Sequence, residues 1–234
     1  MSNSLSVVII TKNEEDFIGD AVKSAQFADE IVVLDSFSVD KTCEIAKKLG
    51  ARVLQREWLG FGAQKNLAIS LASNDWVFVL DSDERITIEL ESEIIETLKN
   101  PLFDGYKIAR LNSFFGKYIK TCGLYPDYSV RLFSRKKGEF ENVPVHESVR
   151  INGKISKLKN HMIHLAYDNV EEFIEKQKRY AFLSNKKKSF VRALISPFWT
   201  FIKLYIFKFG FLDGRHGFLI SKIYAMYTFW KYCK

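Results

Sequence analysis

The sequence predicts an α/β fold in which a mostly parallel sheet carries helices on both faces. Over about the first hundred residues, apolar runs typical of buried strands alternate with segments of helical periodicity. This alternation requires right-handed crossovers, which set parallel strands side by side and cover them with helices. The chain has 234 residues, of which 47% are hydrophobic and 27% charged, a composition typical of a globular protein and not of a disordered one.

Each element of this region has its own signal. The β-branched run Leu5–Thr11 predicts a strand buried on both faces. The segment NEEDFIGDAVKSAQFA that follows has apolar residues at helical spacing and acids in its first turn, where the helix dipole favours them. Gly50 is expected to cap the end of the second helix. Further strands are expected in EIVVLDS, ARVLQRE and DWVFVLDSD, and further helices in VDKTCEIAKKLG, GFGAQKNLAISLA and residues 88–98.

The alternation stops at Asn100 and Pro101. Beyond them, YKIARLNSFFGKYIK and YSVRLFSRKKGEFENVPVHESVRI predict shorter strands with a more antiparallel character, and a helix is expected from Val170. The chain therefore divides into an α/β part, a second part of the same domain, and a basic helical C-terminal region. Their expected bounds are 1–100, 101–168 and 169–234.

Polar side chains follow three of the predicted strands at the point where each strand ends. In parallel sheets of this kind, ligands bind beyond the carboxyl ends of the strands. Helix capping is the alternative explanation; it suits Asp40 and Thr87 but explains Asp81 and Asp83 poorly, because one cap would be enough. Two carboxylates so close together indicate a bound cation. The residues expected to line this crevice are Thr11, Lys12, Asn13, Asp35, Ser36, Asp81 and Asp83.

Several motifs together resemble a known family. SVVIITKNEE, EIVVLDSFSVDKT, GFGAQKNLA and DWVFVLDSDERI are similar to the nucleotide-sugar domain of glycosyltransferase family 2, which has the GT-A fold. The later TCGLYPDYSVRLFSR, VHESV and GFLDG are similar to one branch of that family, the bacterial lipopolysaccharide core glucosyltransferases, which add a β-linked glucose to inner-core heptose. The resemblance covers essentially the whole chain.

The resemblance implies a donor site for a nucleotide sugar, with UDP-glucose as the expected donor. Carried over by position, Asp35 would hydrogen-bond the uracil edge, and Asp81 and Asp83 would form the D-x-D motif that holds the metal and the sugar. The family commonly reads D-S-G-S-T-D-G-T after this strand, whereas Phe37 and Lys41 replace two glycines here. The other residues implied in donor binding are Thr11, Asn13 and Glu14 around the nucleoside, and Lys65 and Asn66 facing the nucleotide.

Elementary chemistry agrees with a metal-dependent transfer. Negative charge develops on a nucleoside diphosphate as it leaves, and Mg²⁺ or Mn²⁺ held by one or two carboxylates and the diphosphate oxygens neutralises that charge. By this argument the acids at the end of the fourth strand are tolerated because a divalent cation bridges them to the diphosphate.

An inverting transfer also needs a base that takes the proton of the acceptor hydroxyl. Asp127 and Glu147 are the candidates, and we favour Glu147 because His146 beside it could orient the site or complete the metal shell. The structural alternative for Glu147 is a surface salt bridge with Arg131, Arg150 or another nearby basic residue. His161 and His164 have no supporting carboxylate in the sequence, so they are interpreted as structural.

The C-terminal part of the chain is basic and aromatic. Residues 1–120 have a charge balance of −5 and residues 121–234 one of +12, which indicates an anionic partner surface, either nucleic acid or membrane. The run PFWTFIKLYIFKFGF contains two lysines and is shorter than the about 20 apolar residues of a spanning helix. It favours a helix at the membrane interface, and the alternative is that its aromatics fill a core.

Three widely spaced cysteines without a C-x-x-C pair suit a reducing compartment. We therefore expect a cytoplasmic enzyme, peripheral on the inner face of the bacterial inner membrane, whose partners are a UDP-sugar, a glycolipid acceptor and an anionic membrane surface. Two alternatives stay open. One is a family 2 enzyme that uses a polyprenyl-phosphate or capsular acceptor. The other is a non-catalytic nucleic-acid-binding protein, which the acidic cluster and the absence of a recognisable binding motif disfavour.

Overall fold

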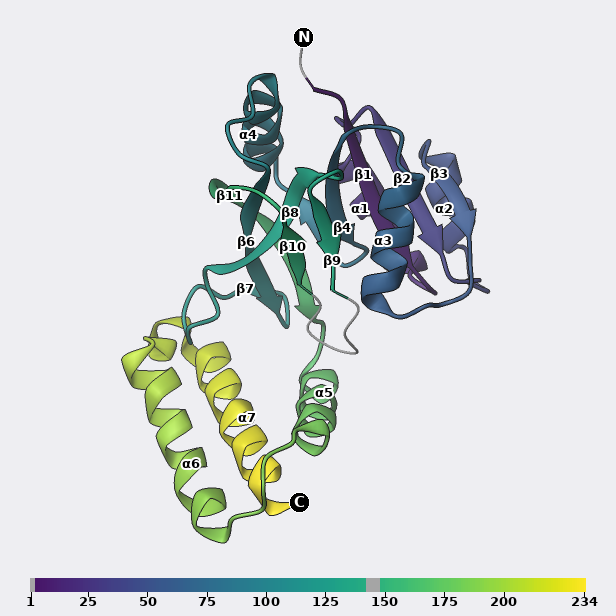
Figure 1. Cartoon of the computed structure of the whole chain (residues 1–234). Helices are drawn as coiled ribbons and strands as arrows, with labels where there is room; N and C mark the ends of the chain where they lie inside the picture. Colours follow the sequence, from purple (N-terminus) through teal and green to yellow (C-terminus); the bar gives the residue numbers. More distant parts are fainter. Residues whose placement is uncertain (1–2, 142–147) are drawn as a thin grey trace. The chain divides into compact units, whose positions relative to one another are not determined.

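The computed structural model describes residues 3–141 and 148–234 of the chain. The chain folds into two compact units. The first contains Met1–Arg110 and Tyr128–His164, and the second contains Leu111–Asp127 and Leu165–Lys234. Each unit has a buried core of its own, and the element labels of Figure 1 are used below.

The sheet begins with four parallel strands, as the sequence predicts. They are β1 (Leu5–Thr11), β2 (Glu30–Asp35), β3 (Arg52–Gln55) and β4 (Trp76–Asp81). Strand β1 lies between β2 and β4, and β3 continues the sheet beyond β2. Beyond β4 the sheet continues in the order β8 (Asp127–Ser134), β6 (Gly105–Phe114), β11 (Ile155–Tyr167) and β5 (Glu84–Ile86). The prediction of an α/β fold with a mostly parallel sheet is confirmed for this half.

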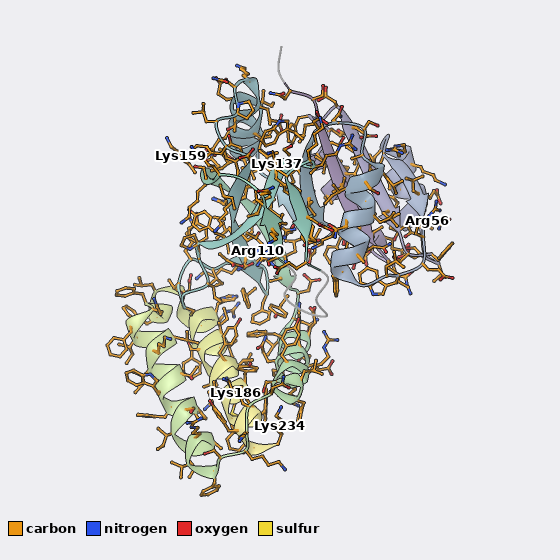
Figure 2. The ribbon with its side chains drawn as sticks, in the orientation of Figure 1. Arg56, Arg110, Lys137, Lys159, Lys186 and Lys234 are labelled. Atoms are coloured by element: carbon orange, nitrogen blue, oxygen red, sulfur yellow. The ribbon has the colours of Figure 1, made fainter. Side chains whose placement is uncertain are left out.

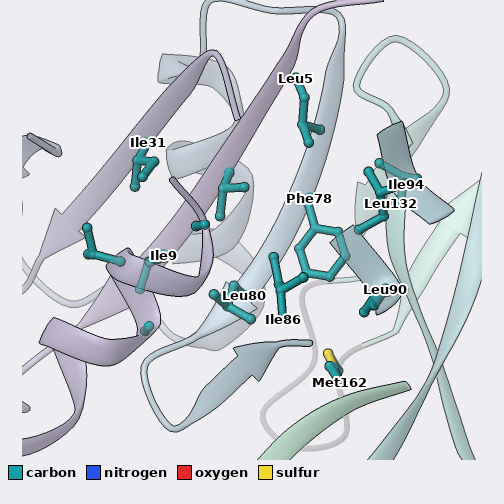
Figure 3. Close-up of a cluster of buried hydrophobic side chains, with 14 of the residues drawn as sticks. Leu5, Ile9, Ile31, Phe78, Leu80, Ile86, Leu90, Ile94, Leu132 and Met162 are labelled. Carbon is teal, nitrogen blue, oxygen red and sulfur yellow. The ribbon is translucent and has the colours of Figure 1, made fainter. Parts of the chain in front are cut away.

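Helices cover both faces of these strands because alternate side chains of each strand point to opposite faces. Val7, Ile9 and Phe78 pack on one face with α1 (Glu15–Ser24), α2 (Thr42–Lys48) and α4 (Ile88–Lys99). Val8, Ile10 and neighbouring residues pack on the other face with α3 (Phe61–Leu71). Figure 3 shows the first of these cores, in which Phe78 lies among Leu80, Ile86, Leu90 and Met162.

The antiparallel part lies mainly beyond residue 100, as expected, although one of its strands, Glu84–Ile86, precedes that residue. It consists of β5 (Glu84–Ile86), β6 (Gly105–Phe114), β7 (Lys117–Tyr118), β8 (Asp127–Ser134) and β11 (Ile155–Tyr167). Strand β8 pairs antiparallel with β4, and β11 pairs antiparallel with β5. A separate two-stranded sheet joins β9 (Gly138–Phe140) to β10 (Val149–Ile151).

The second unit is largely helical. It contains α5 (Val170–Leu183), α6 (Phe190–Ile202), a π-helical turn Lys203–Phe207, a 3₁₀ turn Gly210–Asp213 and α7 (Gly214–Cys233). Helix α7 packs against both α5 and α6. Aromatic side chains from the strand ends and from α5 fill its core: Phe114, Tyr167 and Phe173 are buried together with Ile220. These aromatics lie outside the run PFWTFIKLYIFKFGF, in which Phe198, Trp199 and Phe207 are exposed, so the alternative that the aromatics of that run fill a core does not hold for those three.

Within the described part of the chain, one stretch is long and apolar enough to cross a membrane. Phe190–Phe207 has 18 residues with a mean hydropathy of 1.4, and only 6% of it is buried. The expectation that the run is too short counted only its aromatic half, whereas the helix begins several residues earlier. Length alone thus does not exclude a spanning segment.

Candidate active site

The carboxyl ends of β1, β2 and β4 meet at one edge of the sheet. Thr11 lies opposite Asp35 in the pairing of β1 with β2, and Ile10 lies opposite Asp81 in the pairing of β1 with β4. The polar residues that the sequence places at the strand ends therefore do share one edge. Because β8 pairs with β4 from the other side, this edge also receives side chains from the antiparallel half.

Asp35 is held by a set of hydrogen bonds at the end of β2. The backbone N–H of Ser38 donates to Oδ2 at 2.9 Å, Nε2 of Gln55 donates to the same oxygen at 2.9 Å, and the Ser38 hydroxyl donates to Oδ1. The residue is fully buried. Burial alone would raise the pKa of Asp35, but the bonds from Gln55 and Ser38 outweigh it and lower the pKa below its usual value.

These bonds leave Asp35 limited capacity for a ligand. A carboxylate accepts about four hydrogen bonds, and three are already made here. Gln55 was not among the residues singled out from the sequence. Its position at the end of β3, directly opposite Asp35, is the signal that could have found it.

The loop after β1 is tied to the loop after β2. Asn13 has a φ of +54°, in the left-handed region that asparagine tolerates better than most residues. Its N–H donates to Ser38 Oγ at 2.7 Å, and its Oδ1 accepts from the N–H of Val39 at 2.9 Å. The N–H of Glu14 donates to Oγ1 of Thr42 at 2.8 Å. Asn13 and Glu14 of the predicted nucleoside site are thus held in place by residues that follow β2.

Thr11 differs from these neighbours. Within the part of the chain that the structure describes, its Oγ1 is buried and makes no hydrogen bond. Leaving a buried hydroxyl unpaired costs about 1–3 kcal/mol, so a polar ligand atom at this edge would find a partner already in place.

The replacement of family glycines has a structural reading. Phe37 has a φ of +57°, the conformation that glycine adopts most readily, and its side chain is 53% exposed. The backbone at Phe37 therefore has the left-handed conformation that the family glycine would adopt, at the cost of some conformational strain. Lys41, at the second replaced position, has an ordinary φ of −83°.

The acids after β4 are compensated by basic side chains of the chain itself. Oδ1 of Asp81 lies 3.0 Å from Nζ of Lys65, and its Oδ2 lies 3.0 Å from Nη2 of Arg131. The same Nη2 lies 2.5 Å from Oε1 of Glu84, and Nη1 of Arg110 lies 3.8 Å from that oxygen. Glu84 in turn accepts the N–H of Asp81 through Oε2 at 3.0 Å. These contacts form a buried ion cluster of Lys65, Asp81, Glu84, Arg110 and Arg131.

This cluster corrects two sequence interpretations. Asp81 and Glu84 do not need a metal to offset their mutual repulsion, because Lys65 and Arg131 already neutralise them. Arg131 is also not a surface residue, because it is 4% exposed and pairs with Asp81 and Glu84. Burial raises the pKa of Asp81 by itself, but the charges of Arg131 and Lys65 bring it well below the usual range. Burial, with the neighbouring Asp81 charge, raises the pKa of Glu84.

Asp83 lies apart from that arrangement. Its side chain is 39% exposed, and its Oδ2 is 3.3 Å from Nε2 of His164 on β11. The interpretation of His164 as a histidine without a supporting carboxylate is therefore wrong: the strand pairing of β11 with β5 brings it to Asp83. Arg85 holds the turn between β4 and β5 in place by donating to the carbonyls of Ser82 at 2.6 Å and Phe17 at 2.9 Å. The carbonyl of His161 accepts a hydrogen bond from Thr87 Oγ1 at 2.9 Å.

The residues at this point fit a divalent cation that is completed by a substrate. Within residues 3–141 and 148–234, no group of three or more His, Cys, Asp or Glu side chains is arranged to hold a metal. Magnesium and similar hard cations, however, are usually bound by one or two carboxylates plus substrate phosphates and water. Asp83 with His164 offers one carboxylate and one imidazole. The pKa of Glu14 is raised by burial and then by the nearby Asp83 charge, which shows that negative charge accumulates here.

The remaining predicted residues lie in varied places. Lys65 faces Asp81, as above. Asn66 is engaged by β9, since its Nδ2 donates to the Phe140 carbonyl at 2.9 Å and its Oδ1 accepts the Phe140 N–H at 2.8 Å. Asp127 opens β8 and belongs to the second unit. His146 and Glu147 lie outside the described residues. The donor-binding and catalytic roles of all these residues stay predictions.

Comparison with known proteins finds related glycosyltransferases. Glycosyltransferases of Rickettsia typhi and Rickettsia prowazekii, both uncharacterised, are 32% and 33% identical to this chain over 250 residues, spanning 98% of it and 86% of each relative. The lipopolysaccharide core biosynthesis glycosyltransferase LpsC of Rhizobium meliloti is 27% identical over 240 residues, which cover 96% of this chain and 89% of LpsC.

Solved structures share the fold. The structure of S. aureus TarS in complex with UDP superposes with a TM-score of 0.53 at 20% identity, covering 90% of this chain and 75% of the other. The family model described as glycosyl transferase family 2 matches residues 6–146. With a match over more than half of its length, a GT-A-like sheet and its acidic strand end in place, the chain belongs to glycosyltransferase family 2.

Proposed function

We propose that this enzyme transfers glucose from UDP-glucose, with inversion and with the help of Mg²⁺ or Mn²⁺, to a lipopolysaccharide inner-core or similar glycolipid acceptor. The observation that carries the donor side is the polar edge formed by Thr11, Asp35 and Asp83. The similarity to LpsC supports the acceptor class, and the UDP bound by TarS supports the nucleotide.

The nucleoside end of the donor lies at β1 and β2 in this proposal. Asp35 accepts the imide N–H of uracil with its remaining lone pair, or takes it in place of the Ser38 hydroxyl. Thr11 Oγ1, which is buried and unpaired in the described part of the chain, provides a second polar contact. Both are fixed by the rigid strands on which they stand, which lowers the entropy cost of binding.

The diphosphate end lies at Asp83 and His164 in this proposal, and these two residues would hold the cation. When bound, the cation offsets the negative charge that develops on the departing diphosphate. Lys65 and Arg131 keep Asp81 ionised and fixed beside this position.

The transfer itself is a single displacement. The base removes the proton of the acceptor hydroxyl, the hydroxyl oxygen forms a bond to the anomeric carbon, and the bond from that carbon to the diphosphate breaks so that UDP leaves. Glu147 and Asp127 remain the two candidates for the base, with Glu147 preferred.

Calorimetry tests the donor side directly. UDP-glucose is titrated into the wild-type protein with and without Mn²⁺, and into Asp83→Asn. We expect Mn²⁺ to strengthen binding at least tenfold in the wild type and to have little effect in Asp83→Asn. Asp75→Asn is the matched control, because Asp75 lies just before the start of β4, at the end of the strand away from Asp83. In the contacts described it pairs only with Arg135 and Lys136. Equal Mn²⁺ dependence in Asp83→Asn and wild type would refute the assignment.

The acceptor is tested separately with product analysis by mass spectrometry. Heptose-containing inner-core glycolipid, polyprenyl phosphate and a capsular oligosaccharide are each incubated with the enzyme and UDP-glucose. Transfer to the first alone supports the proposal. Transfer to another acceptor, with donor binding intact, overturns the acceptor class without affecting the donor assignment.

A further inference from the structure

The outer side of α6 in the second unit is apolar and uncovered. Within α6 its exposed residues recur three or four positions apart, and Ile206 of the π-helical continuation follows Trp199 by seven, so they lie along one side of the helix and its continuation. Each of them keeps between 51% and 70% of its surface exposed. We call this the outer face of α6; it consists of Val191, Leu194, Ile195, Phe198, Trp199 and Ile206.

The opposite side of the same helix is already used for packing. Ala193 is buried, and the rings of Phe201 and Tyr205 pack edge-on against Phe218 of α7 at 5.5 and 5.8 Å. Figure 1 shows α6 and α7 side by side, and the N–H of Ser189 donates to the carbonyl of Tyr232, so the two helices run antiparallel. The outer face is therefore what remains after the unit has formed its own core.

An apolar patch of this kind marks an interaction site, and its surroundings indicate the partner. From residue 186 to the end, the sequence has ten Lys and Arg but a single acid, Asp213. That acid is used internally, because Thr121 Oγ1 donates to it at 2.6 Å and Lys117 Nζ lies 3.0 Å from it. Lys186–Lys188 precede the helix, and Lys203 and Lys208 follow it; all five are exposed. Figure 2 labels Lys186 in the second unit.

From this juxtaposition we propose that the outer face of α6 docks on an anionic lipid bilayer, with the helix lying in the headgroup region. Apolar and aromatic side chains enter the boundary of the acyl chains, while the flanking lysines contact lipid phosphates. This inference is independent of the proposed function, since it concerns a surface of the second unit and not the donor site.

Docking along the surface suits the helix pair better than crossing the bilayer. Helix α7 runs beside α6 and carries Lys222 in its middle, with an exposed side chain. If α6 crossed the bilayer, its partner would bring this lysine to the depth of the hydrocarbon, where a charge is costly. A helix lying in the interface leaves Lys222 in water. The turn that connects α6 to α7 also combines apolar and basic side chains at its surface, because Phe209, Leu212 and Lys208 are all exposed.

Vesicle binding of the full-length protein tests the proposal. Co-sedimentation is measured with phosphatidylcholine vesicles that do or do not contain phosphatidylglycerol, at low and high salt. We expect binding to rise with phosphatidylglycerol and to weaken with salt, because the electrostatic part is screened within a Debye length of roughly 8 Å at physiological ionic strength. Equal binding to both kinds of vesicle would overturn the electrostatic part, and absence of binding to either would overturn the proposal.

Two variants separate the apolar and the charged contributions. Phe198→Ser with Trp199→Ser removes two exposed rings and should lower the partition coefficient by at least about tenfold. Ile88→Ser with Leu102→Ser is the matched control, because these residues are 78% and 75% exposed in the first unit. It should bind as the wild type does. Changing Lys186, Lys187 and Lys188 to Glu should reduce binding only to the anionic vesicles.

Two other outcomes would assign the outer face differently. If sedimentation velocity without lipid shows a dimer that Phe198→Ser with Trp199→Ser dissociates, and vesicles do not bind, the face is an interface between two copies. If vesicle-bound protein resists alkaline carbonate extraction, the helix inserts and does not lie on the surface. A spectral blue shift of Trp199 on vesicle binding, absent in Trp199→Phe, supports docking through this face.

Discussion

Arg131 is the residue whose loss should most clearly reveal how the acidic strand end is built. Replacing it by methionine keeps much of its apolar volume but removes the charge that pairs with both Asp81 and Glu84. Glu84 is fully buried and Arg131 is 4% exposed, so water cannot take over the lost contacts without a rearrangement. The ion cluster would retain two carboxylates with only Lys65 and the more distant Arg110 to offset them.

The expected loss of stability is large. Removing one partner of a buried ion pair typically costs about 3–5 kcal/mol, because the other charge stays buried without compensation. In a protein of this size, 1 kcal/mol corresponds to roughly 2–4 °C in Tm, so we expect Arg131→Met to melt about 10 °C below the wild type. Arg110→Met should cost about 1 kcal/mol or less, because Arg110 lies 3.8 Å from Glu84 and its side chain is 26% exposed.

The dependence on pH gives the sharper assay. Burial already raises the pKa of Glu84, and losing Arg131 raises it further. A carboxyl whose pKa is higher in the folded state binds more protons there, so the folded variant gains stability as the pH falls toward the raised pKa. Urea unfolding between neutral and mildly acidic pH should therefore show the penalty of Arg131→Met shrinking with acid, and Glu84→Gln in the same chain should restore part of it. A penalty that is independent of pH and unchanged by Glu84→Gln would refute the reasoning.

Three further predictions concern other parts of the first unit and the choice of base. Burial alone would raise the pKa of Glu30, but hydrogen bonds from Ser6 and Ser73 outweigh it and lower the pKa to about 2. The contribution of Glu30 to folding stability is therefore complete above pH 4.5 and is lost as the pH falls toward 2. In denaturant titrations, Glu30→Gln should be less stable than wild type at neutral pH, by on the order of 2 kcal/mol before solvent screening, and no less stable near pH 2. Burial and then Asp35 raise the pKa of the Cys43 thiol to about 11, so iodoacetamide should label Cys43 far more slowly than exposed Cys233 at pH 8. Peptide mapping should show that Asp35→Asn speeds up the labelling of Cys43. Glu147→Gln should keep UDP-glucose affinity but lower turnover by about 10²–10⁴, whereas normal turnover there and its loss in Asp127→Asn would identify Asp127 as the base.

The fold could be predicted wherever local periodicity decides it. The run Leu5–Thr11 is mostly apolar, and its predicted burial on both faces is confirmed. The helix expected over 88–98 is found at Ile88–Lys99. What local pattern does not encode is the pairing of distant strands. The antiparallel insertion of β8 beside β4, and the pairing of β11 with the three-residue β5, depend on contacts between segments far apart in the sequence.

The same limit explains what was missed in the site. Thr11, Asp35 and Asp81 were predictable because each ends a strand whose neighbours in the parallel sheet follow from the alternation of strands and helices. Arg131 stands 50 positions from Asp81 in a strand whose place was not predictable, so its sequence neighbourhood suggested a surface role. His164 likewise reaches Asp83 only through the pairing of β11 with β5.

The two aspartates of the D-x-D motif therefore do different work, and this affects how their variants should be judged. Asp81 is bound by Lys65 and Arg131, both about 95% shielded from solvent at the side chain, so replacing Asp81 removes a carboxylate that faces two buried cations and should disturb the fold near the edge. Asp83 is partly exposed and contacts an imidazole, so its replacement removes negative charge without leaving a buried cation of the cluster unpaired. Loss of activity in an Asp81 variant consequently does not identify a metal ligand, because a displaced Arg131 would have the same effect. Loss of activity in an Asp83 variant of unchanged stability does point to the cation and the diphosphate.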